Sequence, residues 1–143
     1  MSSGPGLGLP LHPLSRFRAQ GGHVPTSGTE VVRAAFDAYR TQDRDAAERL
    51  MAEELTFTSP QDDHIDRAAY FARCFPTADR LVSQEVLELV DAGDDRVFIL
   101  YEYELKTGAR HRNTEFITVR DGRIVEIQVF FGGRVGSRCP DRH

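Results

Sequence analysis

The sequence predicts an α+β fold in which a curved antiparallel sheet is wrapped by three N-terminal helices, forming a cone with an internal cavity. Three observations predict it. Before residue 80, apolar residues recur at helical spacing in three stretches, and each stretch follows a capping residue. From residue 81 onward, β-branched and aromatic residues alternate with polar ones over four long segments. Short turn sequences separate these segments, so consecutive strands are expected to pair as antiparallel hairpins.

Size and composition limit the kinds of partner. The 143 residues suit one domain with a substantial core. A net charge of −4 provides no basic field for nucleic acid, and no apolar run approaches the roughly 18 residues of a membrane span. Cys74 and Cys139 form neither a disulfide framework nor a zinc spacing, which is typical of a cytoplasmic protein. We expect no metal, no nucleic acid and no membrane partner.

The domain is expected to occupy residues 29–133. Residues 1–28 are rich in Gly and Pro and lack the continuous apolar stretch of a signal peptide, so they predict a flexible N-terminal tail. Residues 134–143 predict a flexible, cationic C-terminal tail.

Three acidic or hydroxyl side chains are predicted to cap the helices. Ser27 and Glu30 have the spacing of a capping box, and the helix that follows should end near Gln42. Asp43 should cap a second helix, and Asp66 a third that ends before Pro76. A short strand at residues 55–59, stopped by a proline, and a polar loop at residues 61–64 are expected between the last two helices. The expected apolar stripes are Val32, Phe36 and Tyr39; Ala46, Ala47, Leu50 and Met51; and Tyr70, Phe71, Cys74 and Phe75.

The later strands are predicted at residues 81–90, 96–105 and 112–133, the last range forming a hairpin. A turn at residues 106–108 sets three pairs of residues opposite one another: Tyr103 and His111, Tyr101 and Asn113, Ile99 and Glu115.

The turn of the last hairpin can be built in two ways. A two-residue turn at Asp121 and Gly122 sets Glu115 opposite Gln128. A three-residue turn with Gly122 in a bulge sets Glu115 opposite Ile127. Because a shift of one residue exchanges the faces, only one of these registers buries Glu115. We favour the three-residue turn, since it gathers Ile117, Val119, Val125, Ile127, Val129 and Phe131 on one face.

The order of elements and the sequences of residues 31–39, 43–60 and 122–132 resemble the nuclear transport factor two-like superfamily, in its SnoaL-like and ketosteroid isomerase-like branch. The resemblance implies the cone fold and a cavity for small molecules, but no single activity. The general base of the steroid isomerases falls on Ser59 here, and their tyrosine donor falls near Ala35. Their protonated acid, which ketosteroid isomerase exemplifies, falls on Glu115. Steroid isomerisation by the usual residues is therefore not expected.

Four residues are the candidate catalytic groups. Glu115, buried among apolar neighbours, would have a raised pKa and could act as acid, base or neutral hydrogen-bond donor; on a sheet surface it would be an ordinary solvated glutamate. Asp62, Asp63 and His64 follow the short strand, where the resemblance places the cone mouth, and His64 could act as a base beside a carboxylate. The same residues could instead form a solvated turn.

Aromatic and polar residues on the predicted concave face are the candidate substrate contacts. They are Phe36, Tyr39, Phe57, Tyr70, Phe71, Tyr101, Tyr103, His111, Asn113 and Phe131. Glu102, Glu104, Glu126 and Gln128 fall on the outer face, which the resemblance implies for a homodimer contact.

Two functions remain open. The first is a cofactor-free acid–base enzyme of the isomerase, cyclase, dehydratase or hydrolase type, acting on a hydrophobic oxygenated molecule. The second is a non-catalytic ligand-binding or dimerisation domain of the same fold, which the missing isomerase base favours.

Overall fold

The computed structural model describes residues 25–136, so most of the expected tails at 1–28 and 134–143 lie outside the described residues. Helix α2 (Gly28–Thr41) begins with the predicted capping box, in which Ser27 accepts from the backbone of Glu30 and the Glu30 carboxylate accepts in return. Helix α3 (Arg44–Leu50) is capped by Asp43 as predicted. These local signals therefore position the first two helices.

The third helical segment is irregular. It starts at α4 (Arg67–Ala69), where Asp66 accepts a hydrogen bond from the backbone N–H of Ala69, as predicted. It continues as a π-helical turn, η2 (Tyr70–Cys74), and a 3-10 helix, η3 (Phe75–Arg80). The prediction that the helix ends before Pro76 is wrong, because Pro76 lies in the first turn of η3, where a missing N–H breaks no helical hydrogen bond.

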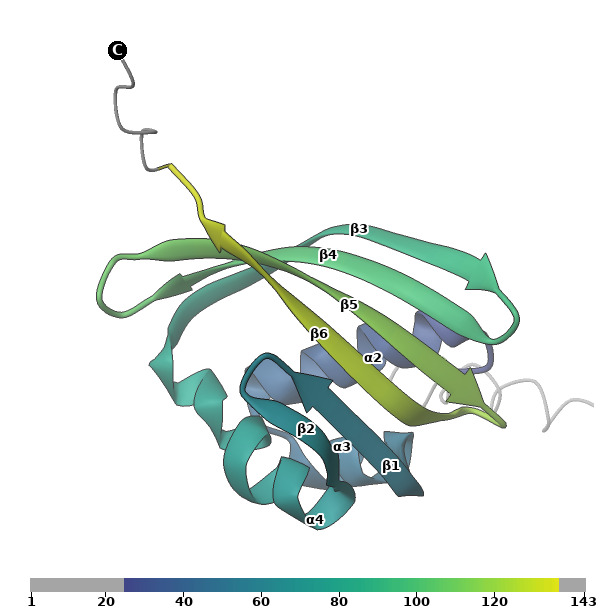
Figure 1. The fold of residues 1–143 in the computed structure, drawn as a ribbon. Helices are drawn as coiled ribbons and strands as arrows, with labels where there is room; N and C mark the ends of the chain where they lie inside the picture. The colour runs from purple at the N-terminus through teal and green to yellow at the C-terminus, as the bar shows by residue number, and fades with distance from the viewer. Residues whose placement is uncertain (1–24, 137–143) are drawn as a thin grey trace, which may run out of the picture.

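Six strands form one curved sheet in the order β2-β1-β6-β5-β4-β3 (Figure 1). They are β1 (Met51–Ser59), β2 (Asp62–Asp66), β3 (Leu81–Gly93), β4 (Arg96–Leu105), β5 (Arg110–Arg120) and β6 (Arg123–Arg134). All neighbours pair antiparallel except β1 and β6, which are parallel, so the sheet is mixed. The prediction of a polar loop at residues 61–64 is wrong, because most of these residues belong to β2. This edge strand is largely polar, so its sequence does not alternate between apolar and polar residues.

The β4–β5 register is the predicted one, with Tyr103 opposite His111, Tyr101 opposite Asn113 and Ile99 opposite Glu115. It follows from the tight turn at residues 106–108, in which Gly108 has a left-handed φ of 96°.

The three-residue turn predicted for the last hairpin is wrong. Arg120 pairs with Arg123, so the turn is the two-residue one, with φ of 54° at Asp121 and 76° at Gly122. A β-bulge at Val125 then shifts the register, and Glu115 pairs with Val129. This shift returns Glu115 to the inner face, and it places Ile124 rather than Val125 in the core.

A second β-bulge in the same hairpin explains why residue 132 is a glycine. Arg112 pairs with Gly133 and Asn113 with Phe131, which leaves Gly132 as the extra residue of a bulge. A Cβ at Gly132 would lie 2.1 Å from the carbonyl oxygen of Arg112. Only glycine fits there without moving the backbone.

The helices lie on one side of the β3–β6 part of the sheet, and α2 contacts all four of those strands (Figure 1). The core that they share includes the fully buried Val31, Val32, Leu55, Ile99 and Ile117. The predicted α+β cone is confirmed.

Candidate functional site

A cavity of about 640 Å³ lies between the helices and the concave face of the sheet. Its size suits a small organic molecule. Four of its lining residues, Gln61, Arg73, Arg80 and Phe131, are exposed and mark its rim. The remaining residues that line it are Ala35, Phe36, Tyr39, Met51, Phe57, Ser59, Asp62, Tyr70, Cys74, Thr77, Leu81, Gln84, Tyr101, Tyr103, Leu105, Asn113, Glu115, Ile117, Ile124, Ile127 and Val129.

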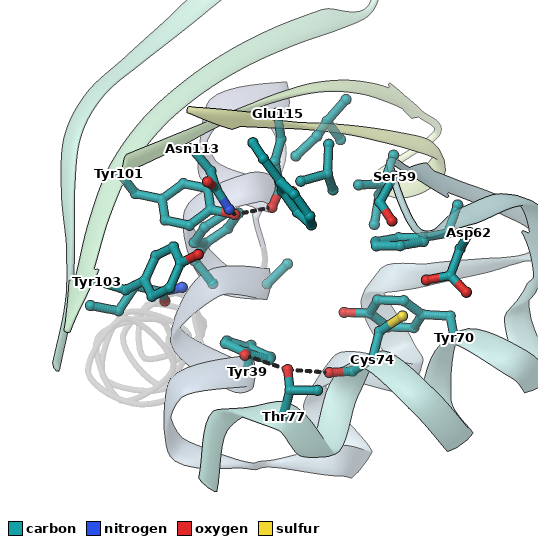
Figure 2. A pocket seen from close by; sticks show the side chains of 18 of the residues that line it. Tyr39, Ser59, Asp62, Tyr70, Cys74, Thr77, Tyr101, Tyr103, Asn113 and Glu115 are labelled. Atoms are coloured by element: carbon teal, nitrogen blue, oxygen red, sulfur yellow. Dashed lines mark hydrogen bonds between the residues drawn. The ribbon is translucent and has the colours of Figure 1, made fainter. Parts of the chain in front are cut away.

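Glu115 projects into this cavity from β5 (Figure 2). Its neighbours along the inner face are Ile99 on β4 and Val129 on β6, neither of which can solvate a carboxylate. Desolvation raises the pKa of Glu115 from 4.5 to about 7, although a hydrogen bond from Tyr101 works in the opposite direction. Both protonation states of Glu115 are therefore accessible near neutral pH.

A directed chain of hydrogen bonds holds the carboxylate. The backbone N–H of Gly132 donates to Asn113 Oδ1 at 3.2 Å, and Asn113 Nδ2 donates to the Tyr101 hydroxyl at 3.4 Å. The Tyr101 hydroxyl in turn donates to Glu115 Oε2 at 2.6 Å. Burial first, and then the nearby Glu115 carboxylate, raises the pKa of Tyr101 well above its ordinary value. Tyr101 is thus a neutral donor that orients the Glu115 carboxylate. The backbone N–H of Gly132, in the bulge, orients the Asn113 side chain that donates to Tyr101.

The opposite wall of the cavity carries hydroxyl groups from the helices (Figure 2). Thr77 Oγ1 donates to the carbonyl oxygen of Cys74 at 2.7 Å, so its contact of 2.7 Å with the Tyr39 hydroxyl must use the Tyr39 proton. Burial raises the pKa of Tyr70 far above its ordinary value and that of the Cys74 thiol to about 11. Neither side chain is ionised at neutral pH, so Cys74 offers no thiolate nucleophile.

Of the ten predicted substrate-contact residues, eight line the cavity: Phe36, Tyr39, Phe57, Tyr70, Tyr101, Tyr103, Asn113 and Phe131. Phe71 does not, because it is buried in the core between Tyr70 and Phe75, with the Arg44 guanidinium 4.9 Å from its ring centre. His111 does not line it either; its ring stacks on Tyr103 with centroids 5.5 Å apart.

The acidic and histidine residues after β1 do not act together on the cavity. Asp62 lines it, with a side chain 16% exposed and 3.4 Å from Arg73. The side chains of Asp63 and His64 are 90% and 65% exposed, and they pair with each other at 2.6 Å in solvent. Adjacent residues of a strand point to opposite faces, which turns Asp63 away from the cavity. His64 would return to the face of Asp62, but its left-handed φ of 50° interrupts the alternation.

Sequence reasoning missed the polar residues that η2, η3 and β3 bring to the cavity. Thr77, Arg80 and Gln84 all line the cavity, as does Arg73 from η2. The irregular helix places them, and a helix ending before Pro76 would have left Thr77 and Arg80 in a connection of unknown course. No cluster of three or more His, Cys, Asp or Glu side chains able to hold a metal occurs in residues 25–136.

Comparisons with known families agree with this architecture. The family model described as a SnoaL-like domain matches residues 32–127. No curated protein matches the chain. In the part of the chain that the structure describes, no helix is long and apolar enough to cross a bilayer.

Solved structures show the same fold. A crystal structure of a protein from Kribbella flavida DSM 17836 has a TM-score of 0.67 and 26% identity, covering 75% of this chain and 88% of that one. A nuclear transport factor 2-like protein of unknown function from Mesorhizobium loti has a TM-score of 0.64 and 27% identity, covering 74% and 91%. Bal32a, from a soil-derived mobile gene cassette, has a TM-score of 0.62 and 20% identity, covering 73% and 88%, and at that identity shows the fold alone.

Proposed function

This chain belongs to the SnoaL-like domain family, and from that premise we propose that it is a cofactor-free acid–base enzyme. It would move a proton, or add or remove water, on a hydrophobic oxygenated molecule held in the cavity. The observation that carries the proposal is Glu115, a carboxyl group with a pKa of about 7 that faces a cavity and is held by Tyr101. A pKa near the working pH is what a general acid–base group needs.

The proposed roles follow from the geometry. Glu115 would take a proton from a carbon or oxygen of the substrate in its ionised form, and return one in its protonated form. Tyr101 would hold the carboxylate oxygen Oε2, leaving Oε1 for the substrate. Tyr70 and Tyr103 would orient substrate oxygens, since both line the cavity and have no hydrogen-bond partner among residues 25–136.

Turnover of a small panel tests this proposal. The panel contains enones, epoxides and polyketide-like ketones, and product formation is followed by mass spectrometry with the wild-type chain and with Glu115→Gln. Conversion by the wild type alone supports the proposal. Ligand binding without any conversion would contradict it.

A non-catalytic ligand-binding domain is the second candidate. One observation favours it: Ser59 and Ala35, which stand where the isomerases have their base and their tyrosine, both line the cavity and supply neither group. A binding domain would tolerate Glu115→Gln with retained ligand affinity and no lost reaction.

We also propose that the chain forms a homodimer in the cytoplasm through the outer face of the sheet. Phe98 and Phe130 are 43% and 50% exposed, and Phe98 packs on Phe116 with centroids 4.4 Å apart. Beside them Glu102 forms ion pairs with Arg110 and Arg112. An apolar centre with a charged rim is typical of subunit contacts. Sedimentation equilibrium should give a dimer mass, and a monomer at all concentrations would contradict this.

A further inference from the structure

One cation on the cavity rim, Arg80, has no counter-charge among residues 25–136. Arg80 ends η3 immediately before β3, is exposed, and lines the cavity. Within residues 25–136 it forms no ion pair and no side-chain hydrogen bond. The other arginine of the rim, Arg73, lies 3.4 Å from the Asp62 carboxylate. The two arginines therefore differ, because among the described residues only the positive charge of Arg73 is compensated by a neighbouring carboxylate.

Neutral donors line the same cavity on β3, the strand that follows Arg80, and on its neighbour β4. Gln84 and Tyr103 pair across β3 and β4, and both line the cavity. Neither the Gln84 amide nor the Tyr103 hydroxyl has a hydrogen-bond partner in the described part of the chain. A guanidinium, an amide and a phenol together match the acceptor oxygens of a carboxylate.

From this arrangement we propose that the cavity takes substrates bearing one carboxylate, which Arg80 binds at the rim while the apolar body lies against the inner face of the sheet. This inference rests on the proposed function, because it names the class of molecule that the same cavity accepts.

The charges of the residues that line the cavity favour a ligand with a single negative charge. Asp62 and Arg73 compensate each other, and Glu115 is neutral when protonated, so the lining then carries one uncompensated positive charge, that of Arg80. A monoanion neutralises it, whereas a phosphate dianion would leave a negative charge in the cavity and oppose ionisation of Glu115.

Matched ligand pairs test the inference. The probes are 4-phenylbutyrate with its primary amide, and octanoate with octanamide, titrated against the full chain by amide NMR at low and moderate salt. Each pair keeps the apolar body and removes only the charge. The carboxylate should bind about tenfold more tightly than the amide, as expected for hydrogen bonds to a charged group. Added salt should weaken binding of the carboxylate alone, because Arg80 is exposed.

Two variants assign the preference to Arg80. In Arg80→Gln the preference should fall to about twofold or less, while binding of the amide is unchanged. Arg123→Gln makes the same charge change at the exposed turn between β5 and β6, and should keep the preference. Equal affinity for carboxylate and amide in the wild type, or an equal loss in both variants, would overturn the inference but leave the proposed function standing. No binding by any probe would count against both.

Discussion

Replacing Glu115 with glutamine is expected to reduce turnover by roughly 100- to 10,000-fold, the usual contribution of a general acid–base group. Glutamine has nearly the same shape and keeps an oxygen that can accept the hydrogen bond from Tyr101, which in the native chain is 2.6 Å long. It cannot take up or release a proton near neutral pH. The cavity and its ligand affinity should therefore persist while the chemical step is lost, and the readout is kcat at saturating substrate.

The matched control is Glu54→Gln, the same chemical change at an exposed residue of β1 that does not line the cavity. Its kcat should equal that of the wild type. If Glu115→Gln retains turnover within about twofold of the control, Glu115 is not the acid–base group, since that loss is far below the expected range.

The stability of the folded chain is expected to decrease as pH rises from about 4.5 to about 7. In that range a folded Glu115 with a pKa of about 7 holds a proton that an unfolded glutamate, with an ordinary value of 4.5, has released. The folded state therefore binds more protons, and its advantage is present in full below about pH 4.5 and lost above about 7. At 1.36 kcal/mol for each pKa unit, the free energy of unfolding should fall by roughly 2–3 kcal/mol between pH 5 and pH 8 from this group alone.

Glu115→Gln isolates this contribution, because every other titrating group is shared by the two proteins. Urea unfolding at both pH values should show the wild type losing those roughly 2–3 kcal/mol relative to the variant, so that the variant is the more stable protein at pH 8. If the free energies of unfolding of the wild type and the variant changed equally with pH, Glu115 would be solvated in the folded state.

The parts of the fold that could be predicted from sequence are those fixed by neighbouring residues. Ser27, Asp43 and Asp66 cap the helices they precede, since a capping hydrogen bond spans only three residues. The β4–β5 register follows from the short turn that contains Gly108. The bulge at Val125 was not predictable in this way, since β6 also pairs with β1, far earlier in the chain, and that pairing is irregular as well.

The residues of the candidate site also differ in whether they could be predicted from the local sequence. Tyr101, Asn113 and Glu115 share a face because strands alternate, and that pattern is visible in the sequence. The inward position of Glu115 was predicted from a wrong turn. In the structure the bulge at Val125 places it on the inner face, where it is half-buried and lines the cavity. Arg80 and Thr77 gave no signal, since a π turn followed by a 3-10 helix has no simple period and tertiary contacts decide where its side chains point.

Titration of the Glu115 carboxyl carbon by NMR is the most direct test of the desolvated acid on which the proposed chemistry depends. The expected midpoint is about 7 in the free chain. In Tyr101→Phe the midpoint should be higher still, because the lost hydrogen bond favours the ionised form. A midpoint near the ordinary 4.5 in the wild type would show a solvated carboxylate and contradict the account.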